Sequence, residues 1–399
     1  MSEKLSIALP VIVEGKYDKI KLDSVLDATV VTTGGFGIFN SREKKALIRR
    51  LCRNGVILLC DSDGAGKVIG PLSATVDPEK KRKIIGSMFV KVTAKAAEEL
   101  GIDFDNTFLA QGTLRPDLIE SGNPDVSGYA NKIKTHHNDV DIIRKFREKG
   151  KIIETNWDWH KDEVRQVARM LGLDEEIASR QPFPGPGLGV RILCNDSTVA
   201  ITTEQRKKLS DFLADYEGGK YGGKIAPIRS VGVQGDNRSY KSLVVLGGGL
   251  PTDWDALFEV ARAIPNNLSF INRVAYRVDS KEPVNTLTCT PMHICHETAE
   301  VLREADAIVT GTVMNKKIAQ CFAVLLPVST DETSARPYSI VIRAVVTSDY
   351  MTARAAVPGI HFPVEALESA AKQIKEKLGD KVDMVLYDVT GKPPATIEW

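Results

Sequence analysis

The chain has 399 residues, 43% of them hydrophobic, and its 53 Lys and Arg nearly balance its 52 Asp and Glu. This length predicts roughly two or three domains with ample apolar residues for buried cores. Near neutrality argues against broad, unspecific nucleic-acid binding. Six cysteines without paired spacing indicate a reducing compartment, and the first apolar stretch is short and holds Pro10. We therefore expect a cytoplasmic protein with no membrane span.

Short β-branched runs alternate with helical patterns over the first 180 residues. Strands are predicted at 11–14, 28–33 and 56–61. A helix is predicted at 41–54, where the apolar positions follow a 3.6-residue period. This alternation predicts a parallel sheet flanked by helices.

A long helix is predicted at 78–100, because Asp77 is a good N-cap and Pro78 suits the first helical turn. The next apolar run, 108–111, is predicted to be a buried strand that ends in a Gly-Thr turn. Ends of such strands are where α/β proteins place ligands.

The segment Arg180–Arg191 holds three prolines and three glycines between two arginines. Alternating Pro and Gly makes a stiff, sharply bent backbone whose amides can face a ligand oxygen. The flanking arginines suit an anion. A structural linker between two domains is the alternative interpretation.

Two later stretches, 224–278 and 317–389, follow one plan of strands, a turn, a helix and a last strand. The order predicts a duplicated α+β subdomain, with 280–291 as the linker between copies. A helix over 294–306 is predicted to lead into the second copy.

Several motifs in family order resemble GMP synthase, the enzyme that aminates XMP with ATP. The resemblance covers roughly residues 70–399 and is closest to the longer, eukaryote-like form. The motifs are 75–86, 108–121, 133–138, 160–165, 180–191, 230–240 and 391–399. The family resemblance implies an ATP-pyrophosphatase domain followed by a dimerisation region that binds XMP, and hence a homodimer.

The first 69 residues resemble the Toprim domain of ribonuclease M5-like proteins. One apolar run delivers Glu14, and a second delivers Asp61 and Asp63. Carboxylates that converge at the ends of parallel strands bind Mg²⁺, which can stabilise the oxygens of a phosphodiester. A turn with a helix cap is the alternative interpretation of the Asp-x-Asp-Gly string.

The expected fold is therefore α/β. A parallel-sheet N-terminal region, Toprim-like and joined to a partial adenine nucleotide alpha hydrolase-like fold, precedes duplicated α+β dimerisation subdomains. The expected boundaries are 1–69, 70–190, 191–283 and 284–399.

The resemblance implies ATP-dependent amination of XMP to GMP through an adenyl-XMP intermediate, with Mg²⁺. The family's Ser-Gly-Gly-x-Asp-Ser pyrophosphate loop is not found, and 33–37 is the nearest match. No glutaminase domain is found either, so ammonia is expected from outside or from a separate glutamine amidotransferase subunit. Two alternatives stay open: a Toprim-type, Mg²⁺-dependent RNA-processing protein, and a non-catalytic XMP-binding dimeric fusion product.

The resemblance also implies roles for individual residues, all of which could instead be ordinary turn, cap or surface positions. The expected catalytic residues are Lys134, His136 and Asp117. The expected XMP ligands are Glu120, Ser121, Arg180, Pro184, Gly185, Gln234, Gly235, Arg238, Gln320, Lys392, Thr396 and Glu398. The expected ATP ligands are Gly112 and Thr113, and the expected Mg²⁺ ligands are Glu14, Asp61 and Asp63.

Overall fold

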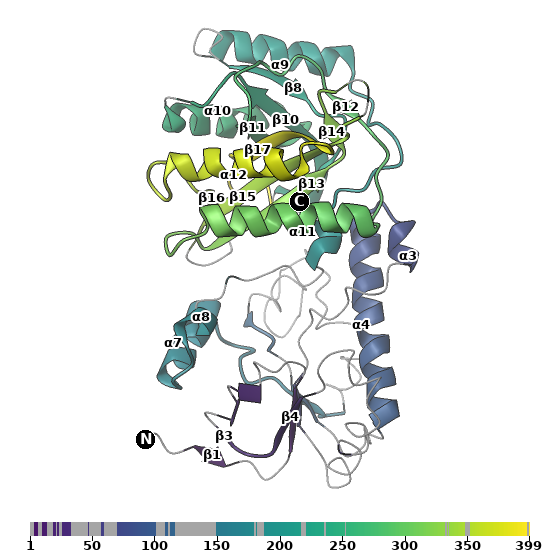
Figure 1. Cartoon of the computed structure of the whole chain (residues 1–399), viewed down its shortest axis with the longest axis vertical. Coiled ribbons are helices and arrows are strands. Elements are labelled where there is room, and N and C mark those ends of the chain that lie inside the picture. Colours follow the sequence, from purple (N-terminus) through teal and green to yellow (C-terminus); the bar gives the residue numbers. More distant parts are fainter. Residues whose placement is uncertain are drawn as a thin grey trace. The chain divides into compact units, whose positions relative to one another are not determined.

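The structure is a computed structural model of the whole chain. It describes residues 4–6, 10–13, 19–20, 22–23, 26–32, 47, 57–59, 70–100, 108–110, 112–115, 149–178, 181, 187–216, 221–234, 237–251, 253–331, 333, 335–347, 352–396 and 399. These form two compact units (Figure 1). Unit 1 comprises 1–68 and 83–180, and unit 2 comprises 69–82 and 181–399. Among the described helices, none has the length and apolar character needed to span a membrane.

Unit 1 contains a parallel five-stranded sheet. Its strands follow the order β4 (Val30–Thr32), β2 (Val11–Val13), β5 (Ile57–Leu59), β6 (Phe108–Ala110) and β7 (Ile152–Ile153). Every neighbouring pair in it is parallel. The strands from the first 69 residues therefore lie in the same sheet as the strand at 108–110.

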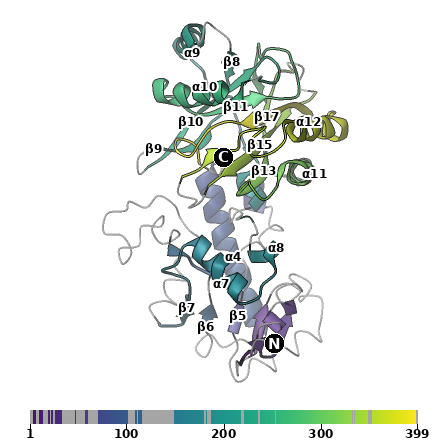
Figure 2. The ribbon, with the colours of Figure 1, turned by 90° about the vertical axis from the view of Figure 1, so that its left-hand side faces the viewer.

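Smaller elements complete the described part of unit 1. Strands β1 (Leu5–Ser6) and β3 (Leu26–Asp27) form a separate parallel pair. Helices α7 (Lys161–Met170) and α8 (Glu175–Ala178) follow β7 along the chain and are seen clearly in Figure 2.

Most of the predicted elements of this region are confirmed. The strands expected at 11–14, 28–33 and 56–61 are β2, β4 and β5, each one or more residues shorter than expected. Of the helix expected at 41–54, all but Leu47 lies outside the described residues. The expected burial at 108–111 is wrong for Phe108, which is 39% exposed and has the Lys151 ammonium 4.9 Å from its ring centroid.

Unit 2 is built on one eight-stranded sheet with the order β13-β15-β17-β11-β10-β8, to which β9 and β16 add at β10 and β15. The first half of the sheet comes from β8 (Gly222–Ile225), β9 (Ser230–Gln234), β10 (Asn237–Gly247) and β11 (Ile271–Arg277). Helix α9 (Thr203–Asp215) precedes it, and α10 (Trp254–Asn267) connects β10 to its parallel neighbour β11.

The second half repeats this order. Strands β13 (Gln320–Leu326), β14 (Val328–Ser329), β15 (Tyr338–Val346), β16 (Arg354–Ala355) and β17 (Val382–Asp388) follow helix α11 (His296–Val313). Helix α12 (Val364–Leu378) connects the parallel neighbours β15 and β17. The helix expected at 294–306 is thus α11, which begins later and continues to Val313. Strand β12 (Thr288–Cys289), in the expected linker, pairs with β14.

The two halves meet where β11 and β17 pair antiparallel at the middle of the sheet. In this pairing Tyr276 lies opposite Tyr387. Helices α9, α10, α12 and α11 run across unit 2 one below another in Figure 1. The Tyr387 ring packs edge-on against Trp254 of α10 and Phe362, which precedes α12. The described strands thus form one continuous sheet with an apolar interior.

The edge strand β13 has its outward backbone N–H groups occupied. Cys321 N donates to the Gln181 side chain (2.7 Å), Ala323 N to the Asp306 side chain (2.8 Å) and Leu325 N to Arg191 O (2.9 Å). The acceptors come from α11 and from the two ends of the Pro/Gly run. Residues 182–186 of that run lie outside the described residues.

Helix α4 (Pro78–Leu100) begins as predicted, because the Asp77 carboxylate accepts from Lys80 N at 2.7 Å. Its first turn is fixed within unit 2. The buried Lys81 ammonium donates to Ile192 O at 2.9 Å, and Tyr240 OH donates to Glu79 at 2.9 Å. Burial lowers the pKa of Lys81 from 10.5, although the nearby Cys194 thiol opposes this shift.

This lowered pKa predicts a pH dependence of stability. Below the usual lysine value but above the pKa in the folded state, the unfolded chain binds more protons, so stability rises with pH. We expect the free energy of unfolding in urea to rise more steeply between about pH 7 and about pH 9 in the wild type than in Lys81→Met. Lys80→Met, at the exposed neighbouring position, is the control and should keep the wild-type slope. Equal slopes in all three proteins would contradict the prediction.

Candidate functional site

The most tightly held part of unit 2 is its C-terminal segment, defined as the described residues among 390–399. It lies beside β9, since Gly232 bridges Ala395 and Val233 N donates to Pro394 O at 2.8 Å. On its other side, Lys392 and Ala353 exchange two backbone hydrogen bonds of 2.7 and 3.1 Å. The segment thus joins the first half of the sheet to the second.

Two arginines and one aspartate lie beneath this segment, and we call them the arginine triad. Arg273 on β11, Arg343 on β15 and Asp388 at the end of β17 are all fully buried. The two guanidinium groups approach the same Asp388 Oδ2 at 2.7 and 3.0 Å. A charge buried so deeply is tolerated only when it is paired and hydrogen-bonded.

The remaining donors of the triad hold the C-terminal segment through its carbonyl groups. Arg343 donates to Thr390 O (2.5 Å) and Thr396 O (3.3 Å). Arg273 donates to Thr396 O (3.2 Å) and to Val231 O of β9 (2.9 Å). The Arg273 guanidinium also stacks on the Trp399 ring, with its carbon 4.3 Å from the centroid. Both arginines therefore clamp the segment to the sheet.

The triad carries two positive charges and one negative charge, a net charge of one positive. Burial lowers the pKa of Arg273 to about 10, with repulsion from Arg343 acting in the same direction and attraction to Asp388 opposing it. The group is still protonated at neutral pH. A buried net positive charge creates a field that favours anions near the adjoining segment.

The structure brings together several of the predicted XMP ligands. Gln234 ends β9 and Arg238 lies in β10 opposite Val233. Lys392 and Thr396 belong to the C-terminal segment that lies alongside β9. Gln320 is buried at the start of β13, opposite Val345 of β15.

In unit 1, the two predicted ATP ligands follow β6. Gly112 is exposed, whereas Thr113 is buried and donates its hydroxyl to Glu154 at 2.6 Å. They lie at the carboxyl end of a parallel strand, as expected for α/β proteins.

Many of the predicted site residues lie outside the described residues, and their roles stay predictions. They are Glu14, Asp61, Asp63, Asp117, Glu120, Ser121, Lys134, His136, Arg180, Pro184, Gly185, Gly235 and Glu398. Within the part of the chain that is described, no group of three or more His, Cys, Asp or Glu side chains could hold a metal ion.

The arginine at the other end of the Pro/Gly run is engaged internally. Arg191 is buried, pairs with Asp306 at 2.6 Å and lies over the Phe322 ring. Its guanidinium therefore has a structural role at the β13 edge in place of the anion-binding role that the sequence suggested.

The sequence reasoning did not identify the arginine triad. A signal was present, because Arg273 and Arg343 interrupt runs that are otherwise apolar and β-branched, and Asp388 ends another. A charged residue inside such a run is expected to be buried with a partner.

A comparison with known protein families bears on the second half of unit 2. Residues 308–399 match the family model described as GMP synthase C terminal domain. The chain is similar to GMP synthases. The match includes β13 to β17 and the C-terminal segment, which are the elements that form most of the site.

Curated relatives extend this similarity over most of the chain. It is 36% identical over 417 aligned residues to a probable glutamine-hydrolysing GMP synthase of Caenorhabditis elegans, covering 87% of this chain and 54% of the relative. The GMP synthase of Dictyostelium discoideum is 35% identical, with 84% and 52% covered. A probable GMP synthase of Leptospira interrogans is 39% identical, with 81% and 52% covered. The chain thus spans about half the length of these relatives.

Proposed function

We propose that the chain is a GMP synthase-like ligase that aminates XMP to GMP. In this reaction ATP adenylates XMP, pyrophosphate leaves, and ammonia then displaces AMP. Ammonia comes from outside the chain or from a separate glutamine amidotransferase subunit. The observation that carries the proposal is the similarity to GMP synthases at residues that form one site around the C-terminal segment.

Within that site, we propose that Lys392, Thr396 and Arg238 bind the XMP phosphate. They come from two elements that lie side by side, β9 with its continuation into β10 and the C-terminal segment. Lys and Arg supply the charge that a phosphate requires, and a hydroxyl adds a donor. The net positive charge of the arginine triad supports an anion at this position.

Isothermal titration calorimetry of the full chain with XMP tests this binding. We expect wild-type binding to weaken at least about tenfold in Arg238→Ala and in Lys392→Ala, since each removes a charge-assisted hydrogen bond. Lys281→Ala, at an exposed lysine in the segment that follows β11, is the control and should bind as the wild type does. A flat titration of the wild-type protein would refute XMP binding.

Turnover is tested separately with ATP, Mg²⁺, XMP and ammonium. We expect AMP and GMP to form in equal amounts, and Lys134→Ala to lower kcat, because a lysine there would neutralise charge as pyrophosphate leaves. XMP binding without AMP formation would leave a non-catalytic XMP-binding protein.

We further propose that the two halves of the eight-stranded sheet arose by duplication. The same order of strands and helices in each half, and the parallel pairs β10–β11 and β15–β17, support this. Assembly of two copies into a homodimer is proposed from the resemblance to the family.

A further inference from the structure

The backbone register relates every position in one half of the sheet to a position in the other. In β10 and β11, Ser242 pairs with Ile271 and then, after an irregularity, Leu243 pairs with Arg273. In β15 and β17, Tyr338 pairs with Val382 and then, after the same irregularity, Ser339 pairs with Met384. Arg273 and Met384 are therefore counterparts, and Tyr276 and Tyr387 are counterparts that face each other.

The arginine triad has no equivalent at its counterpart positions. Counting along the strands from the paired tyrosines, Asp388 corresponds to Arg277 and Arg343 corresponds to Gly247. With Met384 in place of Arg273, no pair of buried arginines can share a carboxylate there. The segment after β11, which corresponds to the C-terminal segment, therefore lacks the clamp.

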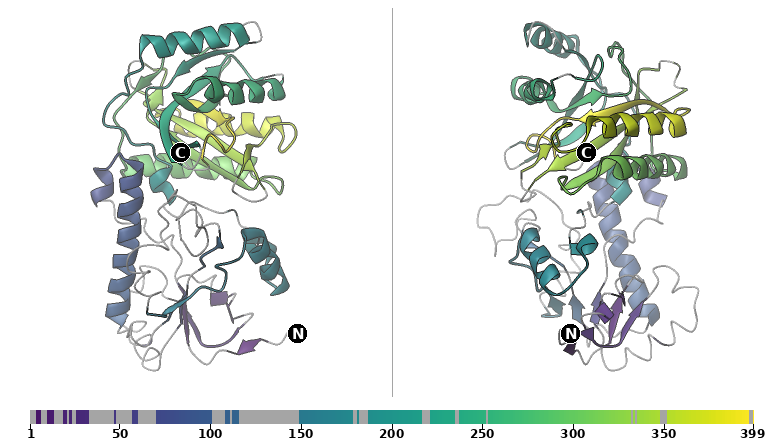
Figure 3. Two further views of the ribbon diagram at one scale, coloured as in Figure 1. Left: turned by 180° about the vertical axis from the view of Figure 1, so that it is seen from behind. Right: turned by 60° about the vertical axis from the view of Figure 1, so that its left-hand side comes forward.

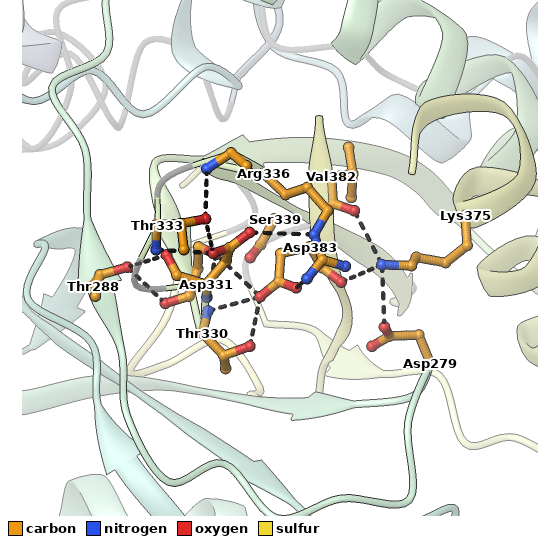
Figure 4. Close-up of polar contacts among 12 residues, drawn as sticks. Asp279, Thr288, Thr330, Asp331, Thr333, Arg336, Ser339, Lys375, Val382 and Asp383 are labelled. Atoms are coloured by element: carbon orange, nitrogen blue, oxygen red, sulfur yellow. Dashed lines mark hydrogen bonds and ion pairs between the residues drawn. The ribbon is translucent and has the colours of Figure 1, made fainter. Parts of the chain in front are cut away.

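Carboxylates occupy the counterpart position instead, as Figure 4 shows. Asp383 accepts from Thr330 N (2.7 Å), Thr330 Oγ1 (2.6 Å) and Ser329 Oγ (3.1 Å). Arg336 pairs with both Asp331 (3.3 Å) and Asp383 (3.4 Å). This network holds the loop between β14 and β15 closed, and its carboxylates would repel a phosphate.

The clamp thus occurs only on the side that holds the proposed phosphate ligands. We propose that Arg273 and Arg343, joined through Asp388, are positioning residues that hold Lys392 and Thr396 in the geometry that binds the nucleotide phosphate. They act through the Thr390 and Thr396 carbonyl groups and need not touch the ligand. This inference rests on the proposed XMP binding.

Hydrogen–deuterium exchange of the full chain tests the positioning role without any ligand. In Arg343→Met we expect the amides of residues 391–396 to exchange at least about tenfold faster, with the β13 amides as internal reference. Arg191→Met is the matched control, because it breaks another buried Arg–Asp pair that does not contact the C-terminal segment. Unchanged exchange in 391–396 would overturn the proposal.

Arg343→Lys keeps the test decisive if Arg343→Met fails to fold. A lysine retains the charge next to Asp388 but cannot reach three acceptors with one planar fork. We expect an intermediate exchange rate in 391–396 and an intermediate dissociation constant for XMP, with the KM for ATP unchanged. Wild-type exchange together with wild-type XMP affinity in this variant would overturn the proposal.

The two proposals fail in different ways. If wild-type protein shows no XMP binding, the proposed function is wrong, and the exchange experiment still decides whether the triad holds the segment. If XMP binds and Arg343→Lys weakens it as much as Arg191→Lys does, the triad is only a stabilising feature and the positioning role is wrong.

Discussion

Asp388→Asn is expected to destabilise unit 2 by about 3–5 kcal/mol, because it leaves two buried guanidinium groups without a counter-charge. Asp388 Oδ2 is the shared acceptor of Arg273 and Arg343, and all three side chains are fully buried. The Asp388 Oδ1 atom also accepts from Thr390 N at 2.9 Å, so the start of the C-terminal segment should loosen as well. Urea unfolding followed by tryptophan fluorescence measures the effect.

The matched control for this prediction is Asp331→Asn, which changes a carboxylate that pairs with the half-exposed Arg336. An exposed pair contributes about 0–1 kcal/mol, so this variant should lose far less stability. A loss in Asp388→Asn as small as that in Asp331→Asn would contradict the importance of the buried pairing.

Gly232→Ala is expected to separate the C-terminal segment from β9. A Cβ atom at this position would lie 2.7 Å from Pro394 O, 2.7 Å from Asn272 Nδ2 and 2.9 Å from Ser239 Oγ. Two of the three atoms belong to rigid, hydrogen-bonded groups, so the segment must move. We expect a loss of about 1–3 kcal/mol in unfolding free energy and at least about tenfold weaker XMP binding.

Gly222→Ala provides the control for that substitution, because it is also a strand glycine and its added Cβ would meet nothing within 4 Å. Thermal unfolding and XMP titration of both variants make the comparison. If Gly232→Ala binds XMP as tightly as Gly222→Ala does, contact between β9 and the C-terminal segment is not required for the site.

Local sequence patterns predicted much of the fold. Helix α4 was predicted from end to end, because Asp77 and Pro78 determine its start regardless of tertiary contacts. The short apolar runs that became β2, β4 and β5 were predicted from β-branched composition. The exposure of Phe108 was not, since local pattern does not reveal which face of a strand the rest of the protein covers.

The candidate site was only partly accessible from sequence. Lys392, Thr396 and Arg238 were proposed from family motifs, but nothing in the sequence indicated that β9 would lie beside the C-terminal segment. The triad joins positions 70 and 115 residues apart in the chain, Arg273–Arg343 and Arg273–Asp388, and depends on the strand order β15-β17-β11. Such pairing is set by topology and not by local preference.

The views of unit 2 in Figure 3 show the sheet from behind and from the side, with β13 at its margin. The outward N–H groups of Cys321, Ala323 and Leu325 already have acceptors from the same chain. An open strand margin invites addition of a strand from another molecule, which leads to aggregation or to sheet extension. Because this margin is filled, two copies that associate must do so through a different surface.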